Sequence, residues 1–474
     1  MRRDAFLRAG AGGMLVAAVA PFDARAAALP AMQHTLTAAP YSFSPDGSTT
    51  YPTLAYNGSL PGPVLRAMRG QEVRVRFQNR AGEPGTVHWH GFILPNAMDG
   101  AAGVTQPAVP AGGDFLYHFH AEPSGTRWYH DHAGLGDVRG LFGAFVVDEP
   151  NEERADAEFV IVLHDVADMQ SFMAAMKGRS DAPMIDPMGS QEMNAMRAGD
   201  RMDDEVRYLA HCINGHSYPS GPVLNVRVGD RVRLRVLNAN QTQTRYLRLA
   251  GHRLTVTHTD GNRLAQSVSV DALRLGVAER LDAWFEVTKP GAWLLQTVLS
   301  DPLAYQQAVL VATPGMQNAS PLGVAQTLDG VDTFSYLGTG GRATTLAPFA
   351  ANRTAHFVLD KDPHIAGRWT MNGKSWPDVP PILVRHGDRV SISFENRSDM
   401  EHPMHLHGHR FNLVSTNGIP FARPLPKDTA LVAPWTGTMT WNFIADAFPG
   451  RWLLHCHNAV HMMGGMMTEV RYIA

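Results

Sequence analysis

The sequence has little cysteine, little charge and, beyond its N-terminal segment, no long apolar run. Two cysteines in 474 residues, Cys212 and Cys456, exclude a framework of several disulfides. Charged residues make up 18% of the chain and the formal net charge is −3, so electrostatics give no case for binding nucleic acid or an anionic membrane. No later segment is apolar enough to span a bilayer. Histidine, by contrast, occurs 22 times and is clustered.

The N-terminus has the pattern of an export signal. Arg2 and Arg3 precede a short apolar stretch, and Ala24-Arg25-Ala26 fits a cleavage site with small residues. We predict a signal peptide over residues 1–26 that resembles the twin-arginine type, which carries folded proteins. The protein is then expected to be periplasmic or secreted. An uncleaved anchor is the alternative, and the shortness of the apolar run disfavours it.

The chain contains an internal repeat. Three stretches share a Pro, a Gly seven residues later and an Asn nine residues after that Gly: Pro63–Asn79, Pro222–Asn238 and Pro380–Asn396. After each Gly, apolar and polar residues alternate, as in Val73, Val75 and Phe77, which is typical of a half-buried β-strand. Repeats of this kind indicate related structural units.

A second repeated element follows the first in each unit: Gly125–His132, Gly291–Val298 and Gly450–His457. Short strands with Gly and Pro turns, without a sustained helical period, favour β-sandwiches. We therefore predict an all-β protein with three sandwich domains, at residues 27–150, 151–335 and 336–474. The second domain carries a Met-rich segment at residues 169–202.

Histidines recur at equivalent places in the first and third units only. His88 and His90 lie nine and eleven residues after Asn79, and His405 and His407 lie nine and eleven after Asn396. The second repeated element adds two further pairs, which are His130 with His132 and His455 with His457. The second unit has Leu247, Leu249, Gln296 and Val298 at these four places.

The spacing of these pairs has a physical reason. On a strand, residues i and i+2 point to the same face, so each His-x-His pair directs two imidazoles into one gap. Imidazole suits copper, with zinc and iron as alternatives. Cys456 stands where the first unit has Asp131, so only the third unit offers a thiolate. With His402, His461 and Met466 it forms the ligand set of a blue copper site: two His, one Cys and a weak axial ligand.

These motifs resemble those of the multicopper oxidases, the family of laccases and the bacterial copper-efflux oxidase. The segments that carry the resemblance are HWHG (88–91), WYHDH (128–132), HPMHLHGH (402–409) and HCHNAVHMMGGM (455–466). The resemblance implies three cupredoxin-like Greek-key domains and four copper ions per chain. It assigns His88 and His405 to type 2 copper; His90, His130 and His457 to one type 3 copper; His132, His407 and His455 to the other; and His402, Cys456, His461 and Met466 to type 1.

The resemblance also bears on proton delivery. Asp99 lies eleven residues after His88, where bacterial members place a proton-relay carboxylate, so we predict a catalytic role beside Cys456. A turn residue before Gly100 is the alternative. Many bacterial members have Glu directly after the second type 1 histidine, whereas this chain has Met462.

The predicted activity is one-electron oxidation of a small reducing substrate coupled to four-electron reduction of O2 to water. The donor is left open among phenols, Cu(I), Mn(II) and Fe(II). The Met-rich segment fits either soft Cu(I) ligation or a packed helical excursion. Met400 matches a substrate-copper Met of the copper-efflux oxidase, or belongs to a polar loop. A non-catalytic periplasmic copper-tolerance protein is the rival function, and a copper nitrite reductase is a weaker one. We expect a monomer without partner nucleic acid or membrane span.

Overall fold

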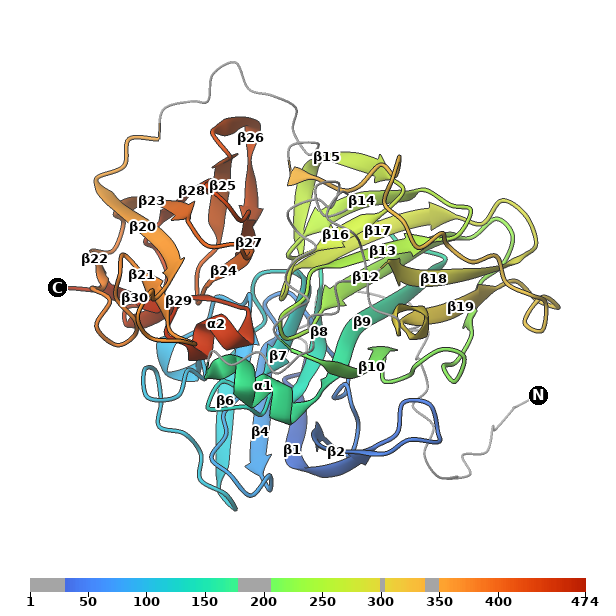
Figure 1. Ribbon diagram of the computed structural model, residues 1–474, viewed down its shortest axis with the longest axis horizontal. Helices are drawn as coiled ribbons and strands as arrows, with labels where there is room; N and C mark the ends of the chain where they lie inside the picture. The colour runs from blue at the N-terminus through green and yellow to red at the C-terminus, as the bar shows by residue number, and fades with distance from the viewer. Residues whose placement is uncertain (1–29, 178–205, 299–302, 337–348) are drawn as a thin grey trace.

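The computed structural model describes residues 30–177, 206–298, 303–336 and 349–474. These residues form six sheets, arranged as two sheets in each of three consecutive parts of the chain (Figure 1). The prediction of an all-β fold with three sandwich units is therefore confirmed. The predicted signal peptide at residues 1–26 and most of the Met-rich segment lie outside the described residues.

The first unit contains two four-stranded sheets. One has the order β2-β1-β4-β6 and the other β3-β8-β7-β5. Their strands are β1 (Met32–Phe43), β2 (Tyr51–Tyr56), β3 (Leu65–Met68), β4 (Glu72–Asn79), β5 (His88–His90), β6 (Asp114–His120), β7 (Gly125–His130) and β8 (Phe142–Asp148).

The second unit contains a six-stranded sheet of order β10-β9-β12-β17-β14-β15 and a five-stranded sheet of order β11-β19-β18-β13-β16. Its strands are β9 (Ala157–Ala167), β10 (Tyr208–Ile213), β11 (Leu224–Asn225), β12 (Arg231–Asn238), β13 (Arg245–Leu249), β14 (Leu254–Thr259), β15 (Asn262–Val270), β16 (Leu273–Leu275), β17 (Arg280–Glu286), β18 (Ala292–Val298) and β19 (Ala308–Ala312).

The third unit repeats the second, with sheet orders β21-β20-β23-β28-β25-β26 and β22-β30-β29-β24-β27. Its strands are β20 (Arg353–Lys361), β21 (Trp369–Met371), β22 (Ile382–Val384), β23 (Arg389–Asn396), β24 (His402–Leu406), β25 (Phe411–Thr416), β26 (Ile419–Lys427), β27 (Thr429–Val432), β28 (Gly437–Ile444), β29 (Arg451–Cys456) and β30 (Met467–Tyr472). The predicted boundaries at residues 150 and 335 remain predictions.

The repeat found in the sequence is the central strand of each unit. β4, β12 and β23 each lie between a parallel partner (β1, β9, β20) and an antiparallel partner (β6, β17, β28). The Asn that ends each strand is buried and its side-chain amide donates to a main-chain carbonyl, of Val109, Leu275 and Ala433 respectively. The repeated spacing therefore marks the same structural position, the end of the central strand, in all three units.

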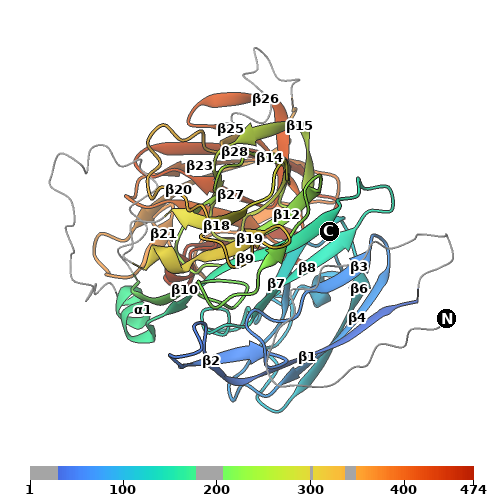
Figure 2. The same ribbon diagram turned by 90° about the vertical axis from the view of Figure 1, so that its right-hand side faces the viewer.

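Two short helices meet where the second unit contacts the third. α1 (Met169–Met176) starts the Met-rich segment, and α2 (Ala459–Met463) follows the His455-Cys456-His457 motif. Phe172 of α1 and Val460 of α2 belong to one buried apolar cluster, and the two helices lie side by side in Figure 1. Figure 2 shows α1 at the edge of the molecule, below β10. Within the described ranges, no helix is both long and apolar enough to cross a membrane.

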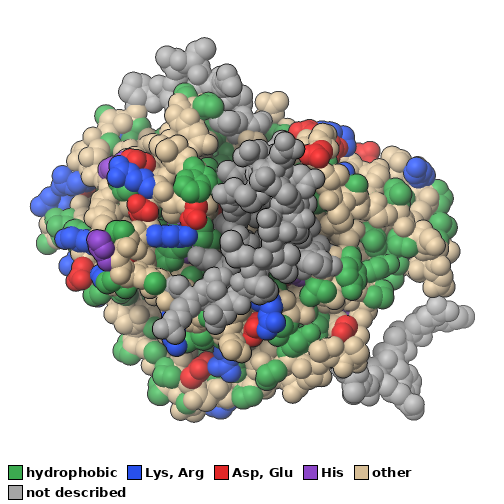
Figure 3. Space-filling model, in the orientation of Figure 1, with side chains coloured by type: hydrophobic (Ala, Val, Ile, Leu, Met, Phe, Trp, Pro, Cys, Tyr) green, Lys and Arg blue, Asp and Glu red, His purple; other side chains and the backbone are tan. Residues whose placement is uncertain are grey.

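On the face shown in Figure 3, basic and acidic side chains are interspersed, as expected for a net charge of −3.

Candidate metal centre

The eight histidines of the four His-x-His pairs converge between the first and third units. β5 and β7 of the first unit are paired antiparallel with His88 opposite His130, and β24 and β29 of the third unit are paired with His405 opposite His455. The second histidine of three pairs lies just beyond its strand: His132, His407 and His457. All eight are buried except His132, which is partly exposed.

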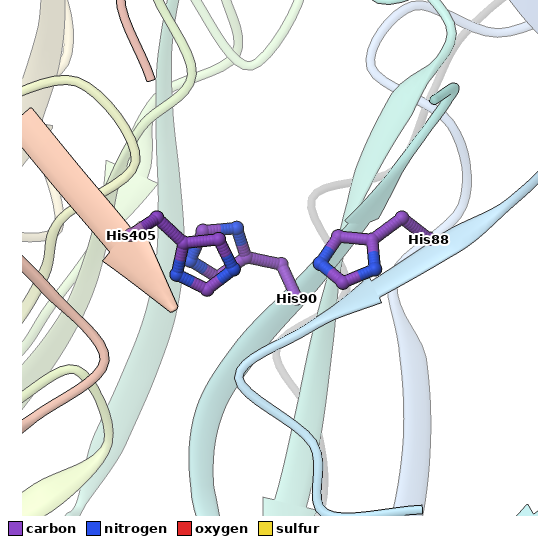
Figure 4. A group of neighbouring side chains, drawn as sticks. All are labelled: His88, His90 and His405. Carbon is purple, nitrogen blue, oxygen red and sulfur yellow. The ribbon is translucent and has the colours of Figure 1, made fainter. Parts of the chain in front are cut away.

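The ring nitrogens of these histidines form three groups, in each of which one ligand atom from every residue lies within 4.8 Å of the others. The groups are His88, His90 and His405; His90, His130 and His457; and His132, His407 and His455. The first group joins β5 to β24 across the gap between the units. Figure 4 shows the rings of His90 and His405 overlapping, and their centroids are 3.7 Å apart at an interplanar angle of 14°.

The hydrogen bonds of these rings leave one nitrogen of each free for a metal. The Nδ1 atoms of His88, His130, His405 and His455 each lie 2.8–2.9 Å from a main-chain carbonyl, to which a neutral imidazole donates. In consequence, Nε2 faces the gap. The buried Nε2 atoms of His88, His130, His405 and His457 have no hydrogen-bond partner among the described residues. Buried polar atoms are rarely left unpaired in this way, so these nitrogens fit the role of metal ligands.

His90 is turned the other way round. Its Nε2 lies 3.0 Å from Oγ1 of Thr429 and 3.2 Å from Oδ1 of Asp428, while its Nδ1 is the buried atom without a partner among the described residues. His90 therefore offers Nδ1 to the gap where its neighbours offer Nε2. In the third group the Nε2 atoms lie close together: Nε2 of His455 lies 3.0 Å from that of His407 and 3.4 Å from that of His132.

Burial keeps seven of these imidazoles neutral. Loss of hydration lowers the pKa of both His132 and His455 to about 3. The same effect, with repulsion from neighbouring imidazoles, holds the pKa of His90, His130, His405, His407 and His457 well below the ordinary value. Because a metal binds only the neutral imidazole, the group is ready to ligate over the physiological pH range.

A separate group contains the cysteine. Sγ of Cys456 lies 3.6 Å from Nδ1 of His402 and 3.5 Å from Nδ1 of His461, and the two nitrogens are 3.0 Å apart. The Nε2 atom of His402 lies 2.8 Å from Oγ of Ser398, which leaves Nδ1 for the centre. Fully buried Met466 is adjacent, because its main-chain N–H donates to the His461 carbonyl and its carbonyl accepts from Cys456. A thiolate with two imidazoles and a nearby thioether is a donor set that suits copper.

Asp99 connects the two units. Its main-chain carbonyl accepts a hydrogen bond from Nδ1 of His88 at 2.8 Å, and its carboxylate Oδ2 accepts one from Nδ1 of His407 at 2.9 Å. Gly100 makes this approach possible, because a Cβ built there would lie 2.0 Å from the Val87 carbonyl oxygen and its φ is +85°. Asp99 is therefore buried among the histidines, and it also ends the turn Asn96–Met98 before Gly100.

Asp428 and Thr429 were not found from the sequence. The Asp428 carbonyl accepts from Nδ1 of His405 at 2.8 Å, and its carboxylate pairs with Arg280 and Arg127. All three side chains are buried. In the sheet register Thr429 pairs with His405 as Leu273 pairs with Leu247, so the second unit has Ala272 at the place of Asp428. This equivalence follows from strand pairing, and no sequence pattern pointed to Asp428.

Other histidines and sulfur residues lie away from these groups. His118 and His120 point outward on β6, where Nε2 of His118 contacts Glu72. His409 bridges the His407 carbonyl and the Tyr472 hydroxyl. Cys212 is a buried free thiol.

The loop before His402 is only partly the polar surface loop that the sequence suggested as an alternative. Asp399 is partly exposed and pairs with Lys361 at 2.7 Å, but Met400 and Glu401 are both buried. The thioether of Met400 is therefore not presented on the surface.

Comparisons with known proteins agree with this geometry. Three stretches match families described as multicopper oxidase: residues 37–152, 187–313 and 348–473. The chain is 34% identical to the multicopper oxidase MmcO of Mycobacterium tuberculosis, over 98% of this chain and 92% of that protein. It is 27% identical to a copper resistance protein A homolog of Pseudomonas syringae, over 88% of each.

A solved structure extends the agreement to the fold. The multi-copper oxidase from Pseudomonas thermotolerans superposes with a TM-score of 0.70 at 26% identity, covering 94% of this chain and all of that chain. The family uses copper, and the histidine and cysteine groups supply suitable ligands. Sequence, fold and site geometry thus lead to the same conclusion: this chain belongs to the multicopper oxidase family.

Proposed function

We propose that the described site holds four copper ions in the arrangement that the sequence predicted. His402, Cys456, His461 and Met466 would hold type 1 copper, and His88 with His405 type 2. The type 3 pair would be held by His90, His130 and His457 on one side and by His132, His407 and His455 on the other. The observation that carries this proposal is the set of buried ring nitrogens that face one gap and have no hydrogen-bond partner in the part of the chain that the structure describes.

The enzyme is an oxidoreductase that couples one-electron oxidation of a reducing substrate to the reduction of O2 to water. When bound, copper supplies the one-electron acceptor and the Lewis-acid and redox centre for O2. Cys456 and its neighbours provide the path between centres. Cys456 is covalently linked to His455 and His457, which belong to two different histidine groups. An electron taken up at the thiolate therefore has a short covalent route to both.

We assign Asp99 as the carboxylate that holds and transfers protons in this gap. It accepts hydrogen bonds from one histidine of each unit and is fully buried. A buried carboxylate beside cationic copper orients its histidine ligands and can exchange a proton with water held there. Met462, which replaces the Glu of many relatives, contributes no acid.

The donor that this chain favours is Cu(I). Met173 of α1 and Met463 of α2 are each 37% exposed, on two helices that pack together, and α2 carries His461. Thioethers are soft ligands that select Cu(I). One relative is named a copper resistance protein A homolog, which agrees with this donor.

Substitution of the exposed thioethers tests the donor. Met173→Leu combined with Met463→Leu is expected to raise KM for Cu(I) several-fold and to leave the rate with a bulky phenol unchanged. Met169→Leu, nearer the start of α1, is the control. An equal loss of activity with Cu(I) and with the phenol would mean that these methionines contribute only to packing.

Metal content and oxygen consumption test the oxidase itself. We expect four copper ions per chain, an intense blue band, and one O2 consumed for every four electrons donated, without free peroxide. A non-catalytic copper-tolerance protein would bind copper but consume no O2 with any reductant.

Export to the periplasm or the medium is part of the same proposal. Replacement of Arg2 and Arg3 by Lys is expected to retain the protein in the cytoplasm, and N-terminal sequencing of the exported form should begin after Ala26. An exported double variant would exclude the twin-arginine route.

A further inference from the structure

The second unit contributes none of the residues proposed above to hold the four copper ions, yet one of its loops contacts two segments that carry type 1 ligands. The loop consists of residues 239–244, between β12 and β13. All six residues are buried, and five of them are polar. Burial of polar groups is unfavourable unless they are hydrogen-bonded, so the hydrogen-bond partners of this loop indicate its role.

On one side, the loop holds the residue before His402. Oγ1 of Thr244 donates to Oε2 of Glu401 at 2.8 Å, and Arg274 pairs with the other carboxylate oxygen. Glu401 is 1% exposed, so its charge is balanced within the protein by these two residues of the second unit. The carboxylate thereby fixes the start of β24, where His402 lies.

On the other side, the loop holds the first turn of α2. The Gln241 carbonyl accepts a hydrogen bond from the main-chain N–H of Ala459 at 2.9 Å. Asn458 caps the same turn, because its Oδ1 accepts from the N–H groups of Val460 and His461. The loop therefore contacts the segment that joins His457 to His461.

The loop is also fixed at its back. Nε2 of Gln241 donates to the Asp137 carbonyl in the first unit at 3.2 Å, and the Thr242 hydroxyl lies 2.6 Å from the Tyr208 hydroxyl. The same six residues thus contact all three units. Figure 1 shows α2 beside α1 at the junction of these units.

We propose that loop 239–244 is a positioning element that fixes His402 and His461 relative to Cys456, and so sets the geometry and reduction potential of the type 1 centre. The Nδ1 atoms of these two histidines are 3.0 Å apart and come from separate segments, β24 and α2. Loop 239–244 contacts both segments, at Glu401 before His402 and at Ala459 before His461. This inference rests on the proposed type 1 assignment, and it gives the ligand-free second unit a role in the redox chemistry.

The sign of the effect follows from charge. The Thr244 hydroxyl directs its hydrogen toward the Glu401 carboxylate. Without it, the negative charge beside the centre is less compensated, which favours Cu(II) over Cu(I). The reduction potential of type 1 copper is therefore expected to fall in Thr244→Val and to be restored in Thr244→Ser.

The test compares Thr244→Val with Thr313→Val in the copper-loaded, full-length protein. Thr313 is a buried threonine of the same unit, and its hydroxyl bonds Gly291 at a distance from the type 1 group. We expect Thr244→Val to show a lower reduction potential, a shifted blue absorption maximum and an altered copper hyperfine splitting. Thr313→Val should lose comparable stability and match the parent in all three properties.

Two results separate the possible failures. A parent protein that binds copper without a blue band would refute the type 1 assignment itself. A blue parent whose potential and spectrum are unchanged in Thr244→Val, or changed equally in Thr313→Val, would overturn the role of the loop. If Thr244→Val does not fold, Glu401→Gln gives the opposite shift, because removal of the negative charge should raise the potential. An unchanged potential there would likewise overturn the proposal.

Discussion

Nδ1 of His407 lies 2.9 Å from Oδ2 of Asp99, and this hydrogen bond joins the third unit to the first. The carbonyl of the same Asp99 orients His88. One residue therefore sets the direction of two imidazoles that come from different units, and its carboxylate remains within the gap that they face. Asp99 can therefore have two roles, orienting the histidines and transferring protons, and substitutions can distinguish them.

Asp99→Asn retains an acceptor for His407 but removes the acid. We expect normal copper content and a normal blue band, with kcat lowered by about 10²–10⁴, the range of general acid–base contributions. Steady-state O2 uptake measures kcat, and metal analysis with the blue absorbance checks the site. Asp399→Asn, at a partly exposed carboxylate paired with Lys361, is the control and should keep parent activity. A variant with full activity would exclude Asp99 from proton transfer.

The metal-binding residues could be predicted because the repeat makes their positions comparable. Four His-x-His pairs stand at two places in the first and third units, where the second unit has Leu247, Leu249, Gln296 and Val298. The strand period then requires each pair to share a face. The structure brings the eight histidines together, in groups that join His90 with His130 and His457, His132 with His407 and His455, and His88 with His405 and also His90. Their assignment to individual copper ions stays a prediction.

The surroundings of the ligands could not be predicted in the same way. Asp428 reaches His90 from another unit, and its pairing with Arg280 joins residues 148 positions apart. No local pattern specifies such a contact. The reversal of His90, which offers Nδ1, depends on that contact and was likewise invisible in the sequence. Packing of α1 on α2 is a third case, because it depends on how two units dock.

Asp428→Asn should destabilise the protein strongly. Asp428 is buried with Arg280 and Arg127, so removal of its charge takes away the carboxylate that both guanidinium groups share, and Arg280 keeps its longer pair with Asp260 at 3.6 Å. Breaking a buried pair in this way costs about 3–5 kcal/mol, against about 0–1 kcal/mol for an exposed pair. Denaturant unfolding of copper-free protein measures the loss, with Asp399→Asn as the exposed control. Similar losses in both variants would contradict the structural role of Asp428.

Cys456→Ser should remove the blue band and oxidation of every donor, because the serine hydroxyl is not a thiolate and does not form the proposed type 1 site. The eight histidines are unchanged, so three copper ions per chain should remain. Cys212→Ser is the matched control, since Cys212 is also fully buried but lies 3.6 Å from the Ser217 hydroxyl, in the second unit. A Cys456→Ser protein that stays blue and turns over would disprove the assignment.

The copper-free protein should lose stability as the pH falls below the ordinary histidine value of 6.5. Seven histidines of the site have lowered pKa values in the folded state, to about 3 for His132 and His455. Below pH 6.5 these histidines bind protons in the unfolded chain but not in the folded chain. The contribution of these residues is therefore complete above pH 6.5 and is lost as the pH falls toward 3.

Each such residue adds about 1.4 kcal/mol per pH unit to the slope of stability against pH. Denaturant unfolding of copper-free protein at pH 7, 6 and 5 measures that slope. His130→Gln should make the slope shallower by about one residue's share, since the pKa of His130 is held well below its ordinary value by burial. His120→Gln, on the exposed face of β6, should leave it unchanged. If His130→Gln and the parent have the same slope, the buried histidines are already protonated in the folded protein, and the proposal of a neutral ligand set is wrong.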